Sequence, residues 1–413
     1  MSRIDAYRYQ VVLLGDSNFL QSVSQDLRQQ LEDKLAELSI DQDHKLVSLL
    51  VSEDAPEIDY SLPVVGLYFG GAAWEERFET DSPVLQSLLG KGITVLPVIN
   101  SSDRFRQNVP KELHPVNAMR LGSGTSEERL ASVLNFILQE FHLLRHHRKV
   151  FISYCREDAL TQAMHLYDTL SAHGFNVFLD THSISKGIDF QQELKHQLMD
   201  ADMMVALHTD NYMSRDWVKE ELNEASVLQI GVIELLCTDQ GDGQAGKSIP
   251  GSLGLPIIMK KMDLLCPVRY QEIEEKIALA VERFLARSLQ ARISNLMGPF
   301  ISWLKKENLS YTLHPSHVVY AEEQDKRILF VPAIGIPDAK VMDDARLWIQ
   351  EYLQDEAGRQ EVKVCLVYDQ LYMKKKWMEH LQWLDGYLPV KTVCIRELDS
   401  YSYHHILEKW KTN

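Results

Sequence analysis

The sequence has few cysteines, and no two of them are close together in the sequence. The five cysteines are far apart and include no Cys-x-x-Cys pair: Cys155, Cys237, Cys266, Cys365 and Cys394. Closely spaced cysteines are typical of disulfide frameworks and of zinc sites. Their absence predicts reduced, buried thiols in a cytoplasmic protein.

Two histidine pairs remain as candidates for a metal site, His146-His147 and His404-His405. Adjacent residues point in different directions on a helix, and no cysteine or carboxylate completes a ligand set at the required spacing. We predict solvated or capping histidines and no metal.

Long apolar runs and an excess of basic charge are also missing. No apolar run approaches the roughly 18 residues of a membrane span, and residues 1–7 lack the basic and then apolar start of a signal peptide. The 43 Lys and Arg residues are outnumbered by 59 Asp and Glu residues, for a formal net charge of −16. We therefore expect a soluble cytoplasmic protein whose main partner is neither a membrane nor a nucleic acid.

What the chain does have is a repeated alternation of short apolar runs and amphipathic stretches. Its 413 residues are enough for about three domains. The alternation runs through residues 1–147, 148–290 and 291–413. It is typical of parallel sheets covered by helices on both faces. The fold class we predict is α/β, in three successive units.

The alternation is clearest in the central unit. The apolar runs that predict its strands are residues 150–152, 175–180, 203–207 and 231–237. Ligands of such sheets bind outside the carboxyl ends of the strands. We therefore predict a pocket among residues 154–156, the loop after residue 180 and the segment after residue 207.

Three motifs of the central unit resemble those of a TIR domain, the Toll/interleukin-1 receptor module. Phe-Ile-Ser-Tyr-Cys-Arg-Glu-Asp at residues 151–158 is similar to the family's opening strand and loop. Val-Phe-Leu-Asp at 177–180, followed by Ser-Ile-Ser-Lys-Gly at 183–187, is similar to its glycine-bearing BB loop. Trp217-Val-Lys-Glu-Glu221 matches the Trp-x-x-x-Glu pattern of the TIRs that cleave NAD. The resemblance covers residues 148–290 and implies a flavodoxin-like TIR domain.

The resemblance implies that Glu221 is the catalytic residue of an NAD glycohydrolase. Nicotinamide departs as a neutral molecule, so the ribosyl oxocarbenium ion is what needs stabilisation, and one carboxylate can supply it. Trp217 lies one turn earlier on the same helix face. From the residues alone, a solvated carboxylate beside Glu220 and Glu224 is the alternative interpretation.

Two substrate-binding positions follow the first strand of the TIR-like segment. Arg156 would pair with the pyrophosphate of NAD, or it is a surface arginine that pairs with Glu157 or Asp158. Tyr154 would line the nucleotide, or it ends the strand.

The other implied positions lie around the glycine-bearing loop. Ser183 and Gly187 shape a loop that, in related TIRs, moves to open the site and contacts the next subunit. Glycine suits such a loop because it tolerates positive φ. Phe190 would lie near nicotinamide, or it is the first core position of its helix.

The flanking units are less distinctive. In residues 1–147, Phe78 stands four residues after Trp74 where a TIR enzyme would have a carboxylate, so we predict either a degenerate TIR-like domain or an unrelated flavodoxin-like one. Residues 291–413 resemble no family, and we suggest a regulatory or sensing role. Tryptophans on helices are typical of cores or interfaces, and this unit has five: Trp303, Trp348, Trp377, Trp383 and Trp410.

One nucleotide-binding pattern is dismissed. Residues 241–248 satisfy the Walker A pattern, but Ile249-Pro250-Gly251 follows and cannot open the helix that a P-loop needs. We predict a surface loop there.

The function implied by the resemblance is a TIR NAD hydrolase of immune, antiphage-type defence. NAD is its substrate, no cofactor is needed, and the product is ADP-ribose or a cyclic form of it. Self-association through TIR domains, triggered by an unknown ligand or protein, would activate it. The alternative is a non-enzymatic TIR scaffold, which needs no carboxylate at Glu221.

Overall fold

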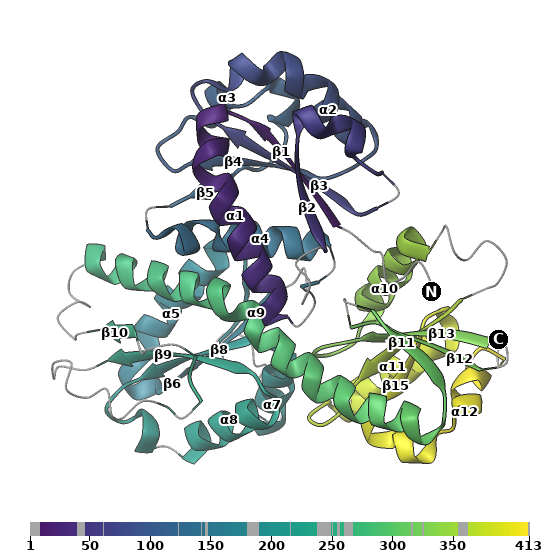
Figure 1. Ribbon diagram of the computed structural model, residues 1–413. Helices are drawn as coiled ribbons and strands as arrows, with labels where there is room; N and C mark the ends of the chain where they lie inside the picture. Colours follow the sequence, from purple (N-terminus) through teal and green to yellow (C-terminus); the bar gives the residue numbers. More distant parts are fainter. Residues whose placement is uncertain are drawn as a thin grey trace. The chain divides into compact units, whose positions relative to one another are not determined.

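Three five-stranded sheets make up the computed structural model (Figure 1). It describes residues 9–38, 46–60, 62–122, 124–141, 143–144, 148–179, 190–214, 216–237, 249, 251–253, 257–259, 267–314, 317–323, 326–353 and 362–411. The chain divides into two compact units, Met1–His146 and His147–Asn413. No helix in the described ranges is long and apolar enough to cross a membrane.

The first unit contains an all-parallel sheet of order β2-β1-β3-β4-β5. Every residue of the interior strand β1 is buried because helices cover the sheet. The strands are β1 (Tyr9–Gly15), β2 (Val47–Val51), β3 (Val64–Gly70), β4 (Val95–Asn100) and β5 (Met119–Leu121). The helices are α1 (Ser17–Glu37), η2 (Ser52–Glu57), η3 (Trp74–Arg77), α2 (Phe78–Gly90), α3 (Phe105–Asn108), η4 (Lys111–Leu113) and α4 (Ser126–Glu140).

The second unit begins with another all-parallel sheet, of order β7-β6-β8-β9-β10. The strands are β6 (Lys149–Tyr154), β7 (Asn176–Phe178), β8 (Met203–His208), β9 (Gly231–Cys237) and β10 (Ile257–Met259). Its helices are α5 (Arg156–Ala172), α7 (Phe190–Asp200), η5 (Tyr212–Ser214) and α8 (Asp216–Val227). The strand order follows that of the first sheet, which suits both a duplicated TIR-like domain and an unrelated flavodoxin-like one.

The third sheet, also in the second unit, has a different topology. Its order is β11-β12-β13-β14-β15, with antiparallel pairing up to β13 and parallel pairing after it. The strands are β11 (Ser310–Leu313), β12 (Val319–Glu323), β13 (Lys326–Pro332), β14 (Lys363–Tyr368) and β15 (Lys391–Cys394). The helices are α10 (Ala339–Leu353), α11 (Lys375–Tyr387), η8 (Ile395–Ser400) and α12 (Tyr403–Glu408). The predicted α/β class is confirmed, and the chain forms three α/β sheets in succession.

The 40-residue helix α9 (Pro267–Lys306) runs between the two sheets of the second unit. The apolar pattern of residues 268–289 and that of residues 293–304 each predict a helix, and the structure corrects this to one continuous helix. No glycine or proline interrupts residues 284–297, so nothing ends the helix at that point. Buried Leu285 and Leu289 continue into buried Ile293 and Met297 at helical spacing. A domain boundary at residues 290/291 would fall inside this helix, and the division into three domains stays a prediction.

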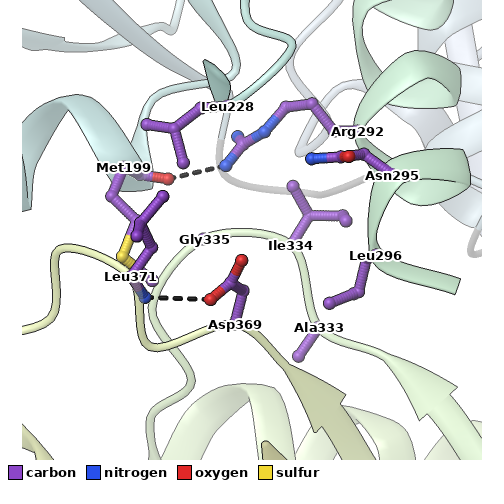
Figure 2. Close-up of a pocket in the computed structure, with 10 residues that line it drawn as sticks. All are labelled: Met199, Leu228, Arg292, Asn295, Leu296, Ala333, Ile334, Gly335, Asp369 and Leu371. Atoms are coloured by element: carbon purple, nitrogen blue, oxygen red, sulfur yellow. Dashed lines mark hydrogen bonds between the residues drawn. The ribbon is translucent and has the colours of Figure 1, made fainter. Parts of the chain in front are cut away.

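Buried polar groups of α9 hold it to the second sheet. Arg292 is 6% exposed and donates to the carbonyl of Met199 at 2.6 Å (Figure 2). It also donates to the carbonyl of Ala201. Ser288 Oγ donates to the carbonyl of Asp202 at 2.7 Å and accepts from the backbone N–H of Gly231 at 2.8 Å. These bonds satisfy carbonyls at the entry to β8, so α9 helps to position that strand.

The tryptophans of the third sheet's region differ in burial. Trp303 is 4% exposed and donates to the Tyr401 carbonyl at 3.2 Å, so it belongs to the core. Trp383 is 57% exposed on α11, so a core position is wrong for it. The side chain of Trp348 lies outside the described residues.

We expect Arg292→Leu to lower the free energy of unfolding of the second unit by about 3 kcal/mol, because two buried carbonyls would lose their donor and the Asp202 carboxylate would lose an ion-pair partner at 3.9 Å. Urea unfolding of the full chain measures this. Arg287→Leu, at an exposed position of the same helix, is the matched control and should change stability by less than about 0.5 kcal/mol. Equal effects of the two substitutions would contradict the proposed role of Arg292.

Candidate functional site

The carboxyl ends of β6 and β8 lie side by side in the second unit. Their register pairs Ser153 with Ala206 and Tyr154 with Leu207. The chain leaves β8 through η5 and returns along α8, which packs against β6. This brings a strand end, a short loop and a helix together where parallel sheets usually bind ligands.

Glu221 lies on the buried face of α8. Val218, Glu221 and Ala225 are the buried residues of this helix and follow the spacing of one helical face. Glu221 is 8% exposed, whereas Glu220 is exposed and pairs with Lys195 at 2.7 Å. The solvated carboxylate considered as an alternative for Glu221 is therefore wrong.

A chain of buried hydrogen bonds ends at the Glu221 carboxylate. Ser153 Oγ donates to Glu221 Oε2 at 2.5 Å, and the Tyr212 hydroxyl donates to Ser153 Oγ at 2.8 Å. Ser153 is 1% exposed and Tyr212 is fully buried. A carboxylate removed from water needs such donors. The bonds therefore fix where the Glu221 carboxylate lies relative to the end of β6.

Tyr212 stays protonated in this arrangement. Burial and the nearby negative charge of Glu221 raise the pKa of Tyr212 well above its ordinary value of 10.0. A neutral phenol keeps its O–H and can donate to Ser153, while Ser153 uses its own hydrogen for Glu221. The Tyr212 hydroxyl consequently points toward Ser153, and the Ser153 hydroxyl points toward the carboxylate.

Two further contacts join the loops around this network. Asp158 accepts from Thr209 Oγ1 at 3.0 Å and from Asn211 Nδ2 at 3.3 Å, which ties the start of α5 to the segment after β8. His208 lies 2.6 Å from the buried carboxylate of Glu234 on β9. Hydrogen bonds between polar side chains thus connect the segments at this edge of the sheet.

Of the other predicted site residues, three have described side chains: one at the end of β6, one at the start of α5 and one on α8. Tyr154, the last residue of β6, is 1% exposed, and Arg156 begins α5 with an exposed side chain. Trp217 lies one turn before Glu221 on α8, and its half-buried ring packs against the core. Phe190 is the first residue of α7, but its side chain lies outside the described part. Ser183, Gly187 and the Walker-like residues 241–248 also lie outside it.

Two cavities lie elsewhere in the second unit. One, of about 30 Å³, is bounded by Met199, Arg292 and Gly335 (Figure 2). The other, of about 480 Å³, lies at the third sheet. None of the predicted site residues lines either cavity. Within the described ranges, no group of three His, Cys, Asp or Glu side chains could hold a metal ion.

Sequence reasoning missed Ser153, Tyr212, Asp158 and the His208–Glu234 pair. A signal for the first of these existed, because Ser153 interrupts the apolar run of β6 next to its carboxyl end. Another signal was the spacing of Glu221 with Val218 and Ala225, which places a carboxylate on an apolar helix face.

A comparison with protein-family models agrees with this geometry. The model described as "TIR domain" matches residues 150–247, from β6 to beyond β9. Residues 150–247 form a TIR domain. The TIR domain therefore contains the network of Ser153, Tyr212 and Glu221, and the sequence-based prediction of the family is confirmed.

Comparisons over the whole chain add little to the family match. A solved structure titled "Structure of the activated Roq1 resistosome directly recognizing the pathogen effector XopQ (TIR domains)" is 17% identical, with a TM-score of 0.23. The match covers 36% of this chain and 83% of that one. No curated protein matches the chain.

We expect Ser153→Ala to lower the free energy of unfolding by about 2 kcal/mol, because a buried carboxylate would lose its hydroxyl donor. Tyr212→Phe keeps the Ser153–Glu221 bond and should cost about 1 kcal/mol. Urea unfolding checks both values, with Ser226→Ala on the exposed side of α8 as control. If Ser153→Ala proved as neutral as Ser226→Ala, the carboxylate would not depend on Ser153.

Proposed function

We propose that the TIR domain is an NAD glycohydrolase and that Glu221 is its catalytic residue. The observation that carries this is the burial of Glu221 on α8, one turn after Trp217 and at the carboxyl edge of the sheet. A carboxylate on the buried face of a helix does not contribute to the solubility of the protein. Such a group is a functional candidate because burying it costs free energy.

The chemistry needs one well-placed anion. The bond between the nicotinamide nitrogen and the ribose carbon breaks, and nicotinamide leaves as a neutral molecule with the bonding electron pair. The carboxylate of Glu221 stabilises the positive ribosyl oxocarbenium ion that remains. Water then attacks this carbon and loses a proton, which gives ADP-ribose; attack by the adenine of the same molecule gives a cyclic product.

Ser153 and Tyr212 position the carboxylate for this role. Because both donate along one chain of hydrogen bonds, the carboxylate reaches the site already oriented, without reorganising during the reaction. Arg156 at the first turn of α5 offers an exposed guanidinium for the pyrophosphate, next to a helix N-terminus that also favours anions. Trp217, one turn before Glu221 on α8, would form part of the wall beside it, and Tyr154 at the end of β6 would line the nucleotide.

The family resemblance extends this proposal to regulation. Self-association of TIR domains through the loop that contains Ser183 and Gly187, with Phe190 at its end, would complete the site. An unknown ligand or protein would trigger this assembly, and NAD loss would serve immune, antiphage-type defence in the cytoplasm.

A TIR scaffold without enzymatic activity is the second candidate, and one observation favours it. The bond from Ser153 holds α8 to the end of β6, so Glu221 has a structural use even without a substrate. A scaffold would need this bond to keep its interaction surface in shape.

We expect nicotinamide release by the purified chain to fall at least about 100-fold in Glu221→Gln, because the amide cannot offset the positive transition state. Chromatography of NAD, nicotinamide and ADP-ribose measures it. Glu220→Gln changes the neighbouring, exposed carboxylate in the same way and should retain the wild-type rate. Similar activity in all three proteins would remove Glu221 from the mechanism.

The rate per molecule should also rise with protein concentration, because assembly completes the site. A rate per molecule that stays constant over a 100-fold range of concentration would contradict activation by self-association. No nicotinamide release at any concentration, also when assembly is forced by fusion to an oligomer, would favour the scaffold.

A further inference from the structure

The larger cavity lies at the third sheet, far along the chain from Glu221. Its volume is about 480 Å³, within the range of roughly 300–1,000 Å³ that small-molecule sites have. It is bounded by the carboxyl ends of β14 and β15 and by α11 and η8. Strands β14 and β15 are parallel, so the cavity lies at the carboxyl edge of parallel strands, where α/β sheets bind ligands.

The charges along the cavity wall decide which ligands it favours. Lys409 lies 3.1 Å from Asp385, and Lys375 lies 3.8 Å from Glu379, so two carboxylates and two ammonium groups cancel. Burial acts to lower the pKa of Lys409, but the negative charge of Asp385 raises it. The ammonium group of Lys409 therefore stays positive. Glu397 is the remaining charged side chain of the wall.

Glu397 has only neutral partners in the described part of the chain. Its Oε1 accepts from Gln370 Nε2 at 3.1 Å, and its Oε2 accepts from the Tyr401 hydroxyl at 3.2 Å. The neighbouring Arg396 is engaged with Asp369 instead. Among the described residues this half-buried carboxylate thus has hydrogen-bond donors but no cationic partner, so a bound cation could pair with it.

The remaining wall suits an organic cation better than an inorganic ion. Tyr368 supplies an aromatic ring, and Met378 and Leu381 supply apolar surface; the ring of Tyr401 is already covered by Lys409 Nζ, 5.7 Å from its centroid. Aromatic faces attract ammonium and guanidinium groups, and apolar side chains cover a carbon skeleton. A phosphate or carboxylate ligand would instead meet a wall with one excess negative charge.

We propose that this cavity binds a small organic cation, an amine or guanidine, through the carboxylate of Glu397. The ammonium or guanidinium group donates to Glu397, and the carbon chain lies between Tyr368 and Met378. The inference rests on the third sheet alone and does not depend on NAD cleavage by the TIR domain.

The test is calorimetric titration of the full chain with two cationic probes, agmatine and putrescine, and with AMP as an anionic probe. We expect saturable binding of at least one cation and none of AMP. Glu397→Gln keeps the size of the side chain but removes its charge, and it should weaken binding tenfold or more. Glu272→Gln, at an exposed position of α9 outside the cavity, should bind as the wild type does.

A second variant guards against misfolding of the first. Met378→Trp fills the cavity without touching a charge and should also abolish binding, while thermal unfolding confirms that both variants remain folded. The proposal is overturned if neither cation binds up to millimolar concentration, if Glu397→Gln binds the cation as tightly as wild type, or if AMP binds in preference to both cations.

Discussion

A carboxylate that leaves water must find hydrogen-bond donors inside the protein, and this constraint organises the TIR domain around Glu221. Ser153 and Tyr212 meet it from two different elements, the end of β6 and the turn η5. These donors can converge only because β6 and β8 are paired in register and α8 packs back against β6. The position of one acidic side chain therefore depends on the correct assembly of a strand pair, a turn and a helix.

The helix α9 extends this dependence beyond the TIR domain. It supplies Ser288 and Arg292 to the backbone at the entry to β8, and its later turns bury Phe300 against Phe330 of the third sheet, with ring centroids 4.7 Å apart. One continuous helix thus contributes to the cores of both sheets. The helix is continuous from Pro267 to Lys306, although Pro299 has no backbone N–H to donate within it, so the two sheets share a common support.

A second connection runs through α11. Lys374, just before this helix, pairs with Glu193 of α7, and the ring of Trp377 lies 5.9 Å from that of His196. In addition, Asp200 at the end of α7 accepts from the backbone N–H of Ile336 at 3.0 Å. Because α11 also lines the 480 Å³ cavity with Met378, a displacement of α11 by a bound molecule would have to be accommodated by α7 of the TIR domain.

The sequence by itself determined the α/β class, the TIR family and four of the five strands of the second sheet; it did not predict β10. Apolar period and motif order are local properties, and Trp217-x-x-x-Glu221 is readable without a fold. The burial of Glu221, its bond to Ser153, 68 residues away, and the continuity of α9 were decided only by the tertiary structure. These features depend on strand register and on helices packing across a sheet, and neither is written in the local pattern of residues. Within the described part of the chain, the lack of a cationic partner for Glu397 is of the same kind, since it depends on how Asp385, Lys409 and Tyr401 meet at one sheet edge.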